Sequence, residues 1–234
     1  MHNKNDYVLV LGSKPHSPMP NIEVTDVYAA NGAAERAKTY KTFFPSANII
    51  SVIGAREFEK NIEVQKRVLD ASPDIVVSRS GKLDLQKYNF KKNTKFITFS
   101  NFEQLMIQSN FFNFHILDII LKETYYESKF FNKIIHLIKS MKNGRLTGAS
   151  TGFFAMLYAA QKYPDANLIL SGLGFQGGKH YYNKGKMTDN RGSVDEYLFK
   201  FLNSQIKDRI YIFDKKISQK LNIKNLDAEE ILLK

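Results

Sequence analysis

The residues best suited to acid–base chemistry are His180, Tyr181 and Tyr182, which follow the sequence Gly-Gly-Lys. Near neutral pH an imidazole can take a proton from a hydroxyl group or donate one to a phosphate. Tyrosine hydroxyls can donate hydrogen bonds to a departing phosphate and stabilise its charge. These residue types predict a catalytic loop; the alternative is a surface loop with ordinary aromatic packing.

A phosphate site is predicted in the segment that precedes this loop. Ser150 and Thr151 are good helix N-cap residues, and Gly152 allows a ligand to approach the backbone closely. Apolar residues at helical spacing predict a helix over 153–163, and Leu168–Leu170 has the composition of a buried strand. This strand ends in Ser-Gly-Leu-Gly-Phe, and ligands of open α/β sheets bind at such carboxyl ends. A capped helix N-terminus beside a glycine-rich strand end suits a nucleotide phosphate.

These residues, in this order, resemble the small sialylmotif and the following His-Tyr motif of sialyltransferases. The resemblance is to glycosyltransferase family 29, and the bacterial enzymes of family 42 are also similar. At the beginning of the chain, Tyr7–Lys14 resembles the strand and glycine-rich turn that open the large sialylmotif. Asp26–Gly32 resembles the second strand of that motif, which ends in an Asn that contacts the donor. The matching segments cover about a third of the chain, and their order and separation are more specific than any one of them.

The resemblance implies transfer of sialic acid from CMP-sialic acid to a hydroxyl group of a glycan or glycolipid acceptor. It implies a metal-independent and inverting reaction without a cofactor, in which the protein orients the substrates, removes a proton and stabilises charge. No Asp-x-Asp metal motif is present in the sequence. The residues that the resemblance assigns to the CMP donor are Gly12, Ser13, Lys14, Asn31, Gly32, Ser150, Thr151, Gly152, Gly172, Gly174, Phe175, Tyr181 and Tyr182. We expect Gly12, Ser13 and Asn31 to lie within about 15 Å of Ser150–Gly152, Gly172 and Phe175, because one nucleotide must contact both sets.

The catalytic base departs from the family pattern. In family 29 a His precedes a Glu by five positions, and alignment on Glu196 places Arg191 where this His belongs. Alignment on the bacterial pattern places Ser193 there instead, and neither residue is a base at pH 7. Three readings follow: the base is His180, it is a carboxylate such as Asp189 or Asp195, or Ser193 is an inactivating substitution. The candidate catalytic residues are therefore His180, Arg191 and Asp195, with Arg191 also suited to hold the donor carboxylate or phosphate.

Short apolar segments alternate with helical patterns along the chain, which predicts an α/β fold: a single Rossmann-like, mainly parallel sheet with flanking helices. We expect one domain over 1–234, as in the sialyltransferase-like variant of this fold, with a helical insertion at 101–143 and a lid loop at 176–193. The expected strands are 8–11, 24–29, 49–53, 75–77, 95–99, 168–170 and 209–213. The expected helices outside the insertion are 32–43, 58–71, 153–163, 194–206, 217–221 and 228–233.

Composition limits the environment and the partners. The chain has no cysteine, which excludes disulfides, and it has no run of eighteen apolar residues. We therefore expect a cytoplasmic protein. The net charge of +11 favours anionic substrates and peripheral contact with the inner face of a membrane. No helix-turn-helix, zinc-finger or RNA-binding aromatic motif accompanies this charge, so we expect no nucleic-acid partner.

Two other functions fit the same residues. The first is a transferase of the same fold that uses CMP-Kdo, because Kdo is a related ulosonic acid and the expected His is missing. The second is a non-catalytic module that binds a nucleotide or polyanion. A dinucleotide-dependent oxidoreductase fits poorly, because Gly12-Ser13-Lys14-Pro15 does not match G-x-G-x-x-G.

Replacing His180 by Ala should lower kcat by roughly 10²-fold or more, since this is the usual cost of losing a general acid–base group. The melting temperature should hardly change, because a loop residue after two glycines contributes little core packing. Release of CMP from the donor and thermal unfolding measure the two effects. Turnover at the parent rate with unchanged donor affinity would exclude both a base and a phosphate role for His180.

Overall fold

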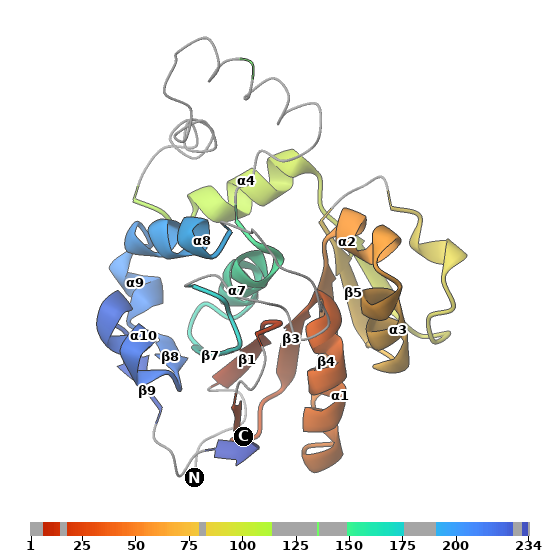
Figure 1. Ribbon diagram of the computed structural model, residues 1–234, viewed down its shortest axis with the longest axis horizontal. Coiled ribbons are helices and arrows are strands. Elements are labelled where there is room, and N and C mark those ends of the chain that lie inside the picture. Colours follow the sequence, from red (N-terminus) through yellow and green to blue (C-terminus); the bar gives the residue numbers. More distant parts are fainter. Residues whose placement is uncertain are drawn as a thin grey trace.

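The computed structural model describes residues 7–14, 18–79, 83–113, 135, 149–175, 191–226 and 231–233, with only the backbone of 191–194 and 231–233 (Figure 1). Its main strands are β1 (Tyr7–Leu11), β3 (Asp26–Ala30), β4 (Asn48–Ile53), β5 (Ile75–Ser78), β6 (Lys95–Thr98), β7 (Asn167–Ser171), β8 (Ile210–Ile212) and β9 (Lys224–Asn225). The α-helices are α1 (Ala34–Phe43), α2 (Ala55–Lys60), α3 (Ile62–Asp70), α4 (Asn101–Ser109), α7 (Thr151–Lys162), α8 (Arg191–Lys200), α9 (Ser204–Lys207) and α10 (Lys215–Leu221). Two 3₁₀ turns, η2 (Asn31–Ala33) and η3 (Leu85–Lys87), complete the helical segments of the described ranges.

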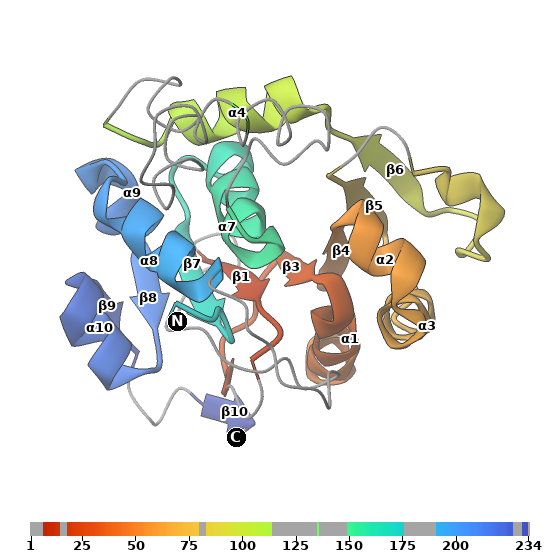
Figure 2. The ribbon, with the colours of Figure 1, turned by 45° about the horizontal axis from the view of Figure 1, so that its top comes forward.

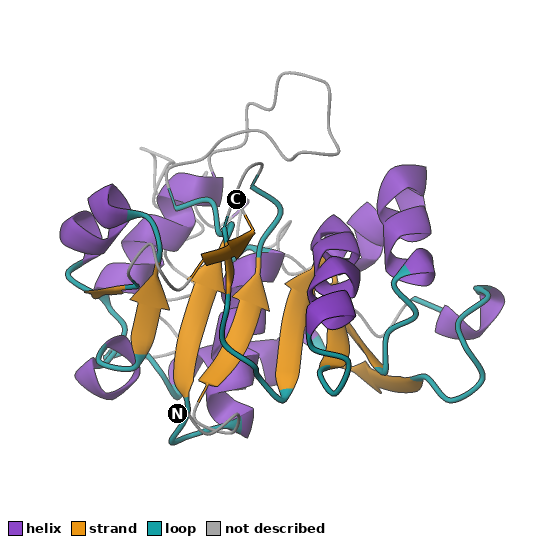
Figure 3. Ribbon diagram, turned by 90° about the horizontal axis from the view of Figure 1, so that it is seen from below, coloured by secondary structure: helices purple, strands orange, loops and turns teal. Residues whose placement is uncertain are grey.

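The eight main strands form one sheet in the order β6-β5-β4-β3-β1-β7-β8-β9, and every neighbouring pair is parallel. Figure 3 shows the strands side by side, with helices in front of the sheet and behind it. The chain adds strands outward from β1 as far as β6 and then returns to the other side of β1 with β7. The strand order therefore reverses between β1 and β7, which is the point where ligands of open α/β sheets bind. The expected α/β fold with a mainly parallel sheet is confirmed.

Both faces of the sheet are buried, as the apolar strand sequences require. In β1, Val8 and Val10 face one core, whereas Tyr7, Leu9 and Leu11 face the other. The first core is covered by α4, α7, α8, α9 and α10, and the second by α1, α2 and α3. In Figures 1 and 2, α4 lies above α7 and runs across the upper part of the molecule. The two layers place α1 and α7 on opposite faces, and both helices begin at the carboxyl ends of the strands.

Two expected helices are each divided by an asparagine. The helix expected over 58–71 is α2 followed by α3, because Asn61 has extended backbone angles and its side chain accepts hydrogen bonds from the N–H groups of Glu63 and Val64. The helix expected over 194–206 is likewise α8 followed by α9, with Asn203 accepting a bond from the Ile206 N–H. Asparagine favours the N-cap over the helix interior, and here that preference outweighs the continuous apolar pattern.

The helix expected over 228–233 is wrong. Residues Ile231–Leu233 form a strand, β10, which pairs in antiparallel fashion with β2 (Met19–Pro20). Three apolar residues are too few to sustain a helix alone, and pairing with β2 satisfies their backbone groups instead.

The expected insertion at 101–143 begins with α4, and residues 114–134 and 136–143 lie outside the described part of the chain. The expected lid loop is affected in the same way, since 176–190 are not described. Its last three residues, 191–193, belong to α8 and are helical. Among the described residues, no helix combines the length and apolar composition needed to cross a membrane.

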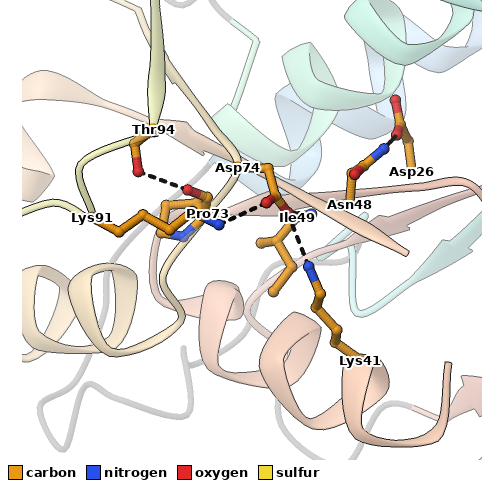
Figure 4. Close-up of polar contacts among 8 residues, drawn as sticks. All are labelled: Asp26, Lys41, Asn48, Ile49, Pro73, Asp74, Lys91 and Thr94. Atoms are coloured by element: carbon orange, nitrogen blue, oxygen red, sulfur yellow. Dashed lines mark hydrogen bonds and ion pairs between the residues drawn. The ribbon is translucent and has the colours of Figure 1, made fainter. Parts of the chain in front are cut away.

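A partly buried polar network fixes the amino edge of the sheet (Figure 4). The Asp74 carboxylate accepts hydrogen bonds from the Ile49 N–H at 2.8 Å, from Lys41 at 3.1 Å and from Lys91 at 2.6 Å. Nearby, Thr94 donates to the Pro73 carbonyl and Asn48 donates to Asp26. Asp74 thus ties α1, β4 and the connection before β6 to the start of β5.

Burial by itself raises the pKa of Asp74, but its hydrogen bonds outweigh this effect. Bonds from Lys91, the Ile49 N–H and Lys41 together hold the pKa of this carboxyl below its ordinary value. A carboxyl whose pKa is lower in the folded protein stabilises the fold above its unfolded pKa of about 3.9. That contribution is lost as the pH falls through the lowered pKa.

Replacing Asp74 by Asn should lower the free energy of unfolding by about 1–2 kcal/mol at pH 7, because hydrogen bonds between charged groups are lost. The difference from the parent protein should shrink as the pH falls below about 4, through the unfolded pKa and then through the lowered pKa of the folded protein, since the parent carboxylate becomes protonated there. Urea denaturation at several pH values measures it. Asp70→Asn, at an exposed position in the last turn of α3, removes the same charge and serves as the control. A pH-independent difference would contradict the assigned role.

Candidate functional site

The reversal point of the sheet is closed by direct backbone contact between the segments that follow β1 and β7. The Gly12 N–H donates to the Ser171 carbonyl at 2.7 Å, and the Lys14 N–H donates to the Gly172 carbonyl at 2.9 Å. A Cβ atom on Gly12 would lie 2.2 Å from the Gly172 carbonyl oxygen, so only glycine fits at position 12. Gly172 has a φ of 76°, which also favours glycine. Both glycines are therefore required by the approach of the two segments to each other.

From Gly12 a series of contacts leads along the carboxyl edge to β4. The Ser13 hydroxyl donates to the Ala30 carbonyl at the end of β3. The next residue, Asn31, has a φ of 49° and accepts a hydrogen bond from the Gly54 N–H at 2.9 Å. Gly54 follows β4, and a Cβ atom placed on it would lie 3.2 Å from the Thr151 Oγ1.

The series then returns through the first turn of α7 to its starting point. A Cβ atom on Gly152 would lie 3.5 Å from the Leu173 Cγ and 3.9 Å from the Ala30 Cβ. Leu173 directly follows Gly172, so these hydrogen bonds and close approaches form a closed ring. We call it the switch-point ring; its members are Gly12, Ser13, Ala30, Asn31, Gly54, Thr151, Gly152, Gly172 and Leu173. The structure thus brings Gly12, Ser13 and Asn31 close to Thr151, Gly152 and Gly172, which we expected to contact the same nucleotide.

The N-terminus of α7 is held by a side chain from α8. Ser150 is the N-cap of α7, and its hydroxyl accepts a hydrogen bond from the Phe153 N–H at 3.1 Å. The Ser150 N–H in turn donates to the Asp195 Oδ1 at 2.9 Å. Asp195 is 4% exposed, so its carboxylate is a buried acceptor that positions the start of α7. A negative charge at a helix N-terminus also interacts favourably with the helix dipole.

The other end of α7 is fixed at the amino edge of the sheet. Tyr163, which follows the last turn, donates its hydroxyl hydrogen to the Asp26 Oδ2 at 2.5 Å. Burial, together with the hydrogen bond to Asp26 and its charge, raises the pKa of Tyr163 above its usual value. The phenol therefore remains protonated, and remains a donor to Asp26, throughout the neutral range.

The remaining predicted residues have different positions. Phe175 is 1% exposed and packs edge-to-face against Phe199, so its side chain belongs to the core. Lys14 lies 4.0 Å from Asp214, a partly exposed pair of small energetic value. Gly32 lies in η2, directly after Asn31, and Gly174 follows Leu173. His180, Tyr181 and Tyr182 lie outside the described residues, as does the side chain of Arg191, which begins α8.

Two arginines at this edge were not predicted from the sequence. Arg79 follows β5, with its Nη1 3.5 Å from the Thr151 Oγ1 and its guanidinium carbon 4.9 Å from the centre of the Phe154 ring. Arg36, from α1, donates to the Ser171 Oγ at 3.4 Å. A basic residue directly after a buried strand was the available signal for Arg79, but its partners are remote in the sequence.

The arrangement combines glycine backbone, the first turn of a twelve-residue helix and an arginine at one edge. Helix N–H groups and a guanidinium both favour anions with several oxygens, such as phosphate or carboxylate. Across the described ranges, no three side chains of the types that bind metals come close enough together to hold an ion.

Replacing Asp195 by Ala should lower the free energy of unfolding by about 1–3 kcal/mol, because the Ser150 N–H loses its acceptor in a partly buried position. Asp195→Asn keeps an acceptor oxygen at the same place and should recover most of this loss. Urea denaturation of both variants measures the difference. Equal stability of the Ala and Asn variants would contradict the positioning role of the Ser150 contact.

Comparison of the chain with models of protein families, with curated proteins and with solved structures finds no match.

Proposed function

We propose that the switch-point ring binds the CMP part of an activated sugar acid and that the protein transfers this sugar to a hydroxyl group of a glycan acceptor. CMP-sialic acid is the donor that the sequence motifs favour, within a sialyltransferase-like variant of the fold. The observation that carries the proposal is the closed ring itself. Apart from Gly54, its residues come from the two separate parts of the chain that resemble the large and the small sialylmotif, and they meet at the reversal point of the strand order.

The polar groups of the ring divide into two sets. Ser13 and Asn31, and next to the ring the N-cap Ser150, each form a hydrogen bond within the protein, so we assign them to shaping the site. Thr151 and Gly152 open α7, where N–H groups without intrahelical partners can meet a phosphate. We therefore assign the donor phosphate to the first turn of α7 and the nucleoside to the segments after β1 and β7.

The chemistry required of the protein is modest, because CMP leaves as a stable phosphate monoester. Positioning of the acceptor hydroxyl and removal of its proton are the main tasks. His180 remains our candidate for the proton transfer. Asp195 is better suited to holding α7, since it is buried and bonded to the Ser150 N–H.

The test is to measure binding of CMP by titration calorimetry and then release of CMP from CMP-sialic acid and CMP-Kdo in the presence of glycan acceptors. Thr151→Ala should weaken donor binding by about 1 kcal/mol, roughly fivefold, with a smaller change in kcat. Thr39→Ala, at an exposed position of α1, is the matched control and should leave affinity unchanged.

Each outcome has a distinct meaning. Turnover of one donor identifies the sugar, and turnover of CMP-Kdo alone would select the Kdo transferase. Binding of CMP without turnover of either donor would favour the non-catalytic nucleotide-binding module. Absence of CMP binding to the parent protein would refute the proposal.

A further inference from the structure

Arg79 is held in a fixed position at the carboxyl end of β5. Its Nε donates to the Gln104 Oε1 at 2.9 Å, and the Gln104 Nε2 donates back to the Arg79 carbonyl at 2.8 Å. Gln104 is 1% exposed and lies on α4, so this reciprocal pair anchors both the backbone and the side chain of Arg79. Little conformational entropy remains for the guanidinium to lose when a ligand binds.

The guanidinium is oriented toward the first turn of α7. It stacks over the Phe154 ring, which is fully buried, and its Nη1 lies 3.5 Å from the Thr151 Oγ1. Thr151 is a member of the switch-point ring, and its hydroxyl also lies beside Gly54. The guanidinium of Arg79 therefore lies next to this ring. A planar cation is thus placed next to the helix turn to which we assign the donor phosphate.

The strand order indicates which part of the donor reaches this cation. β5 is separated from β1 by β3 and β4, and neighbouring strands lie about 4.8 Å apart. Arg79 is therefore about 14 Å along the edge from the reversal point, where the nucleoside is assigned. A phosphate at the α7 turn lies between these two positions, so the group attached beyond the phosphate extends toward β5.

We infer that Arg79 binds the carboxylate of the transferred sugar acid and so selects an acidic sugar over a neutral one. This inference rests on the proposed function and adds to it the residue that recognises the sugar. The fork of guanidinium donors matches the two oxygens of a carboxylate, and the fixed side chain makes this recognition specific.

The experiment is a cycle of changes in the protein and in the ligand. Dissociation constants are measured by calorimetry for CMP, for an unreactive CMP-sialic acid analogue and for the methyl ester of that analogue. The proteins are the parent, Arg79→Gln, Arg79→Lys and Lys162→Gln. Lys162 lies exposed in the last turn of α7, at the opposite edge of the sheet, and its replacement makes the same change in net charge.

In the parent protein, esterification should weaken binding at least about tenfold, because a charge-assisted hydrogen-bonded pair is lost. Arg79→Gln should weaken binding of the acid by a similar factor, bind acid and ester equally, and keep the parent affinity for CMP. The affinity of Arg79→Lys for the acid should lie between those of the parent protein and Arg79→Gln, since lysine keeps the charge but lacks the fork of donors. Lys162→Gln should behave as the parent protein.

Three results would overturn the inference. An equal loss of affinity for acid, ester and CMP in Arg79→Gln would assign Arg79 to the phosphate or to the structure of the site, because all three ligands carry the phosphate. If the parent protein binds CMP but has the same affinity for the acid as for the ester, carboxylate recognition is excluded and the nucleotide site remains in place. Failure of the parent to bind CMP would remove the proposed function and this inference with it.

Discussion

The arrangement of the candidate site depends on the backbone contact between Gly12 and Gly172. The segments after β1 and β7 continue to exchange hydrogen bonds beyond the ends of their strands, and this brings them too close for a side chain at position 12. The positive φ of Gly172 turns the second segment toward α7. Because of this contact, the beginning of the chain and its last third form one edge, and the other members of the switch-point ring follow from it.

The two edges of the sheet differ in their chemistry. At the amino edge, carboxylates are bonded by lysines, by Asn48 and by Tyr163, which fixes the packing of the layers. At the carboxyl edge, glycines and helix N-termini lie together, and the N–H groups of Gly12, Lys14 and Gly54 donate to acceptors within the protein. α7 joins the two edges, with Tyr163 bonded to Asp26 at one end and Ser150 bonded to Asp195 at the other. The position of its first turn is thus set from both ends.

Most of the fold could be predicted because buried parallel strands are short, apolar and bounded by polar turns; all seven expected strands are present with small shifts at their ends. The errors lie where a local side-chain contact decides, as at Asn61 and Asn203, or where a distant partner decides, as at β10. The same division applies to the site. Ser150 was recognisable as a cap from its neighbours. Arg79 was not recognisable, because Gln104 and Phe154, which orient it, come from α4 and α7. Asp195 was identified as polar and near the site, but only its burial and its bond to Ser150 indicate a positioning role.

The central place of β1 has a consequence for how the protein is made. β1 can pair with β3 once both have left the ribosome, but its other edge pairs with β7, in a register that joins Tyr7 to Asn167. At about 5–20 residues per second, synthesis of the intervening chain takes on the order of 10 s. During this time one edge of a fully apolar strand has no partner from its own chain, which is the situation that promotes aggregation. The nascent chain should therefore require protection by a chaperone until β7 has been synthesised.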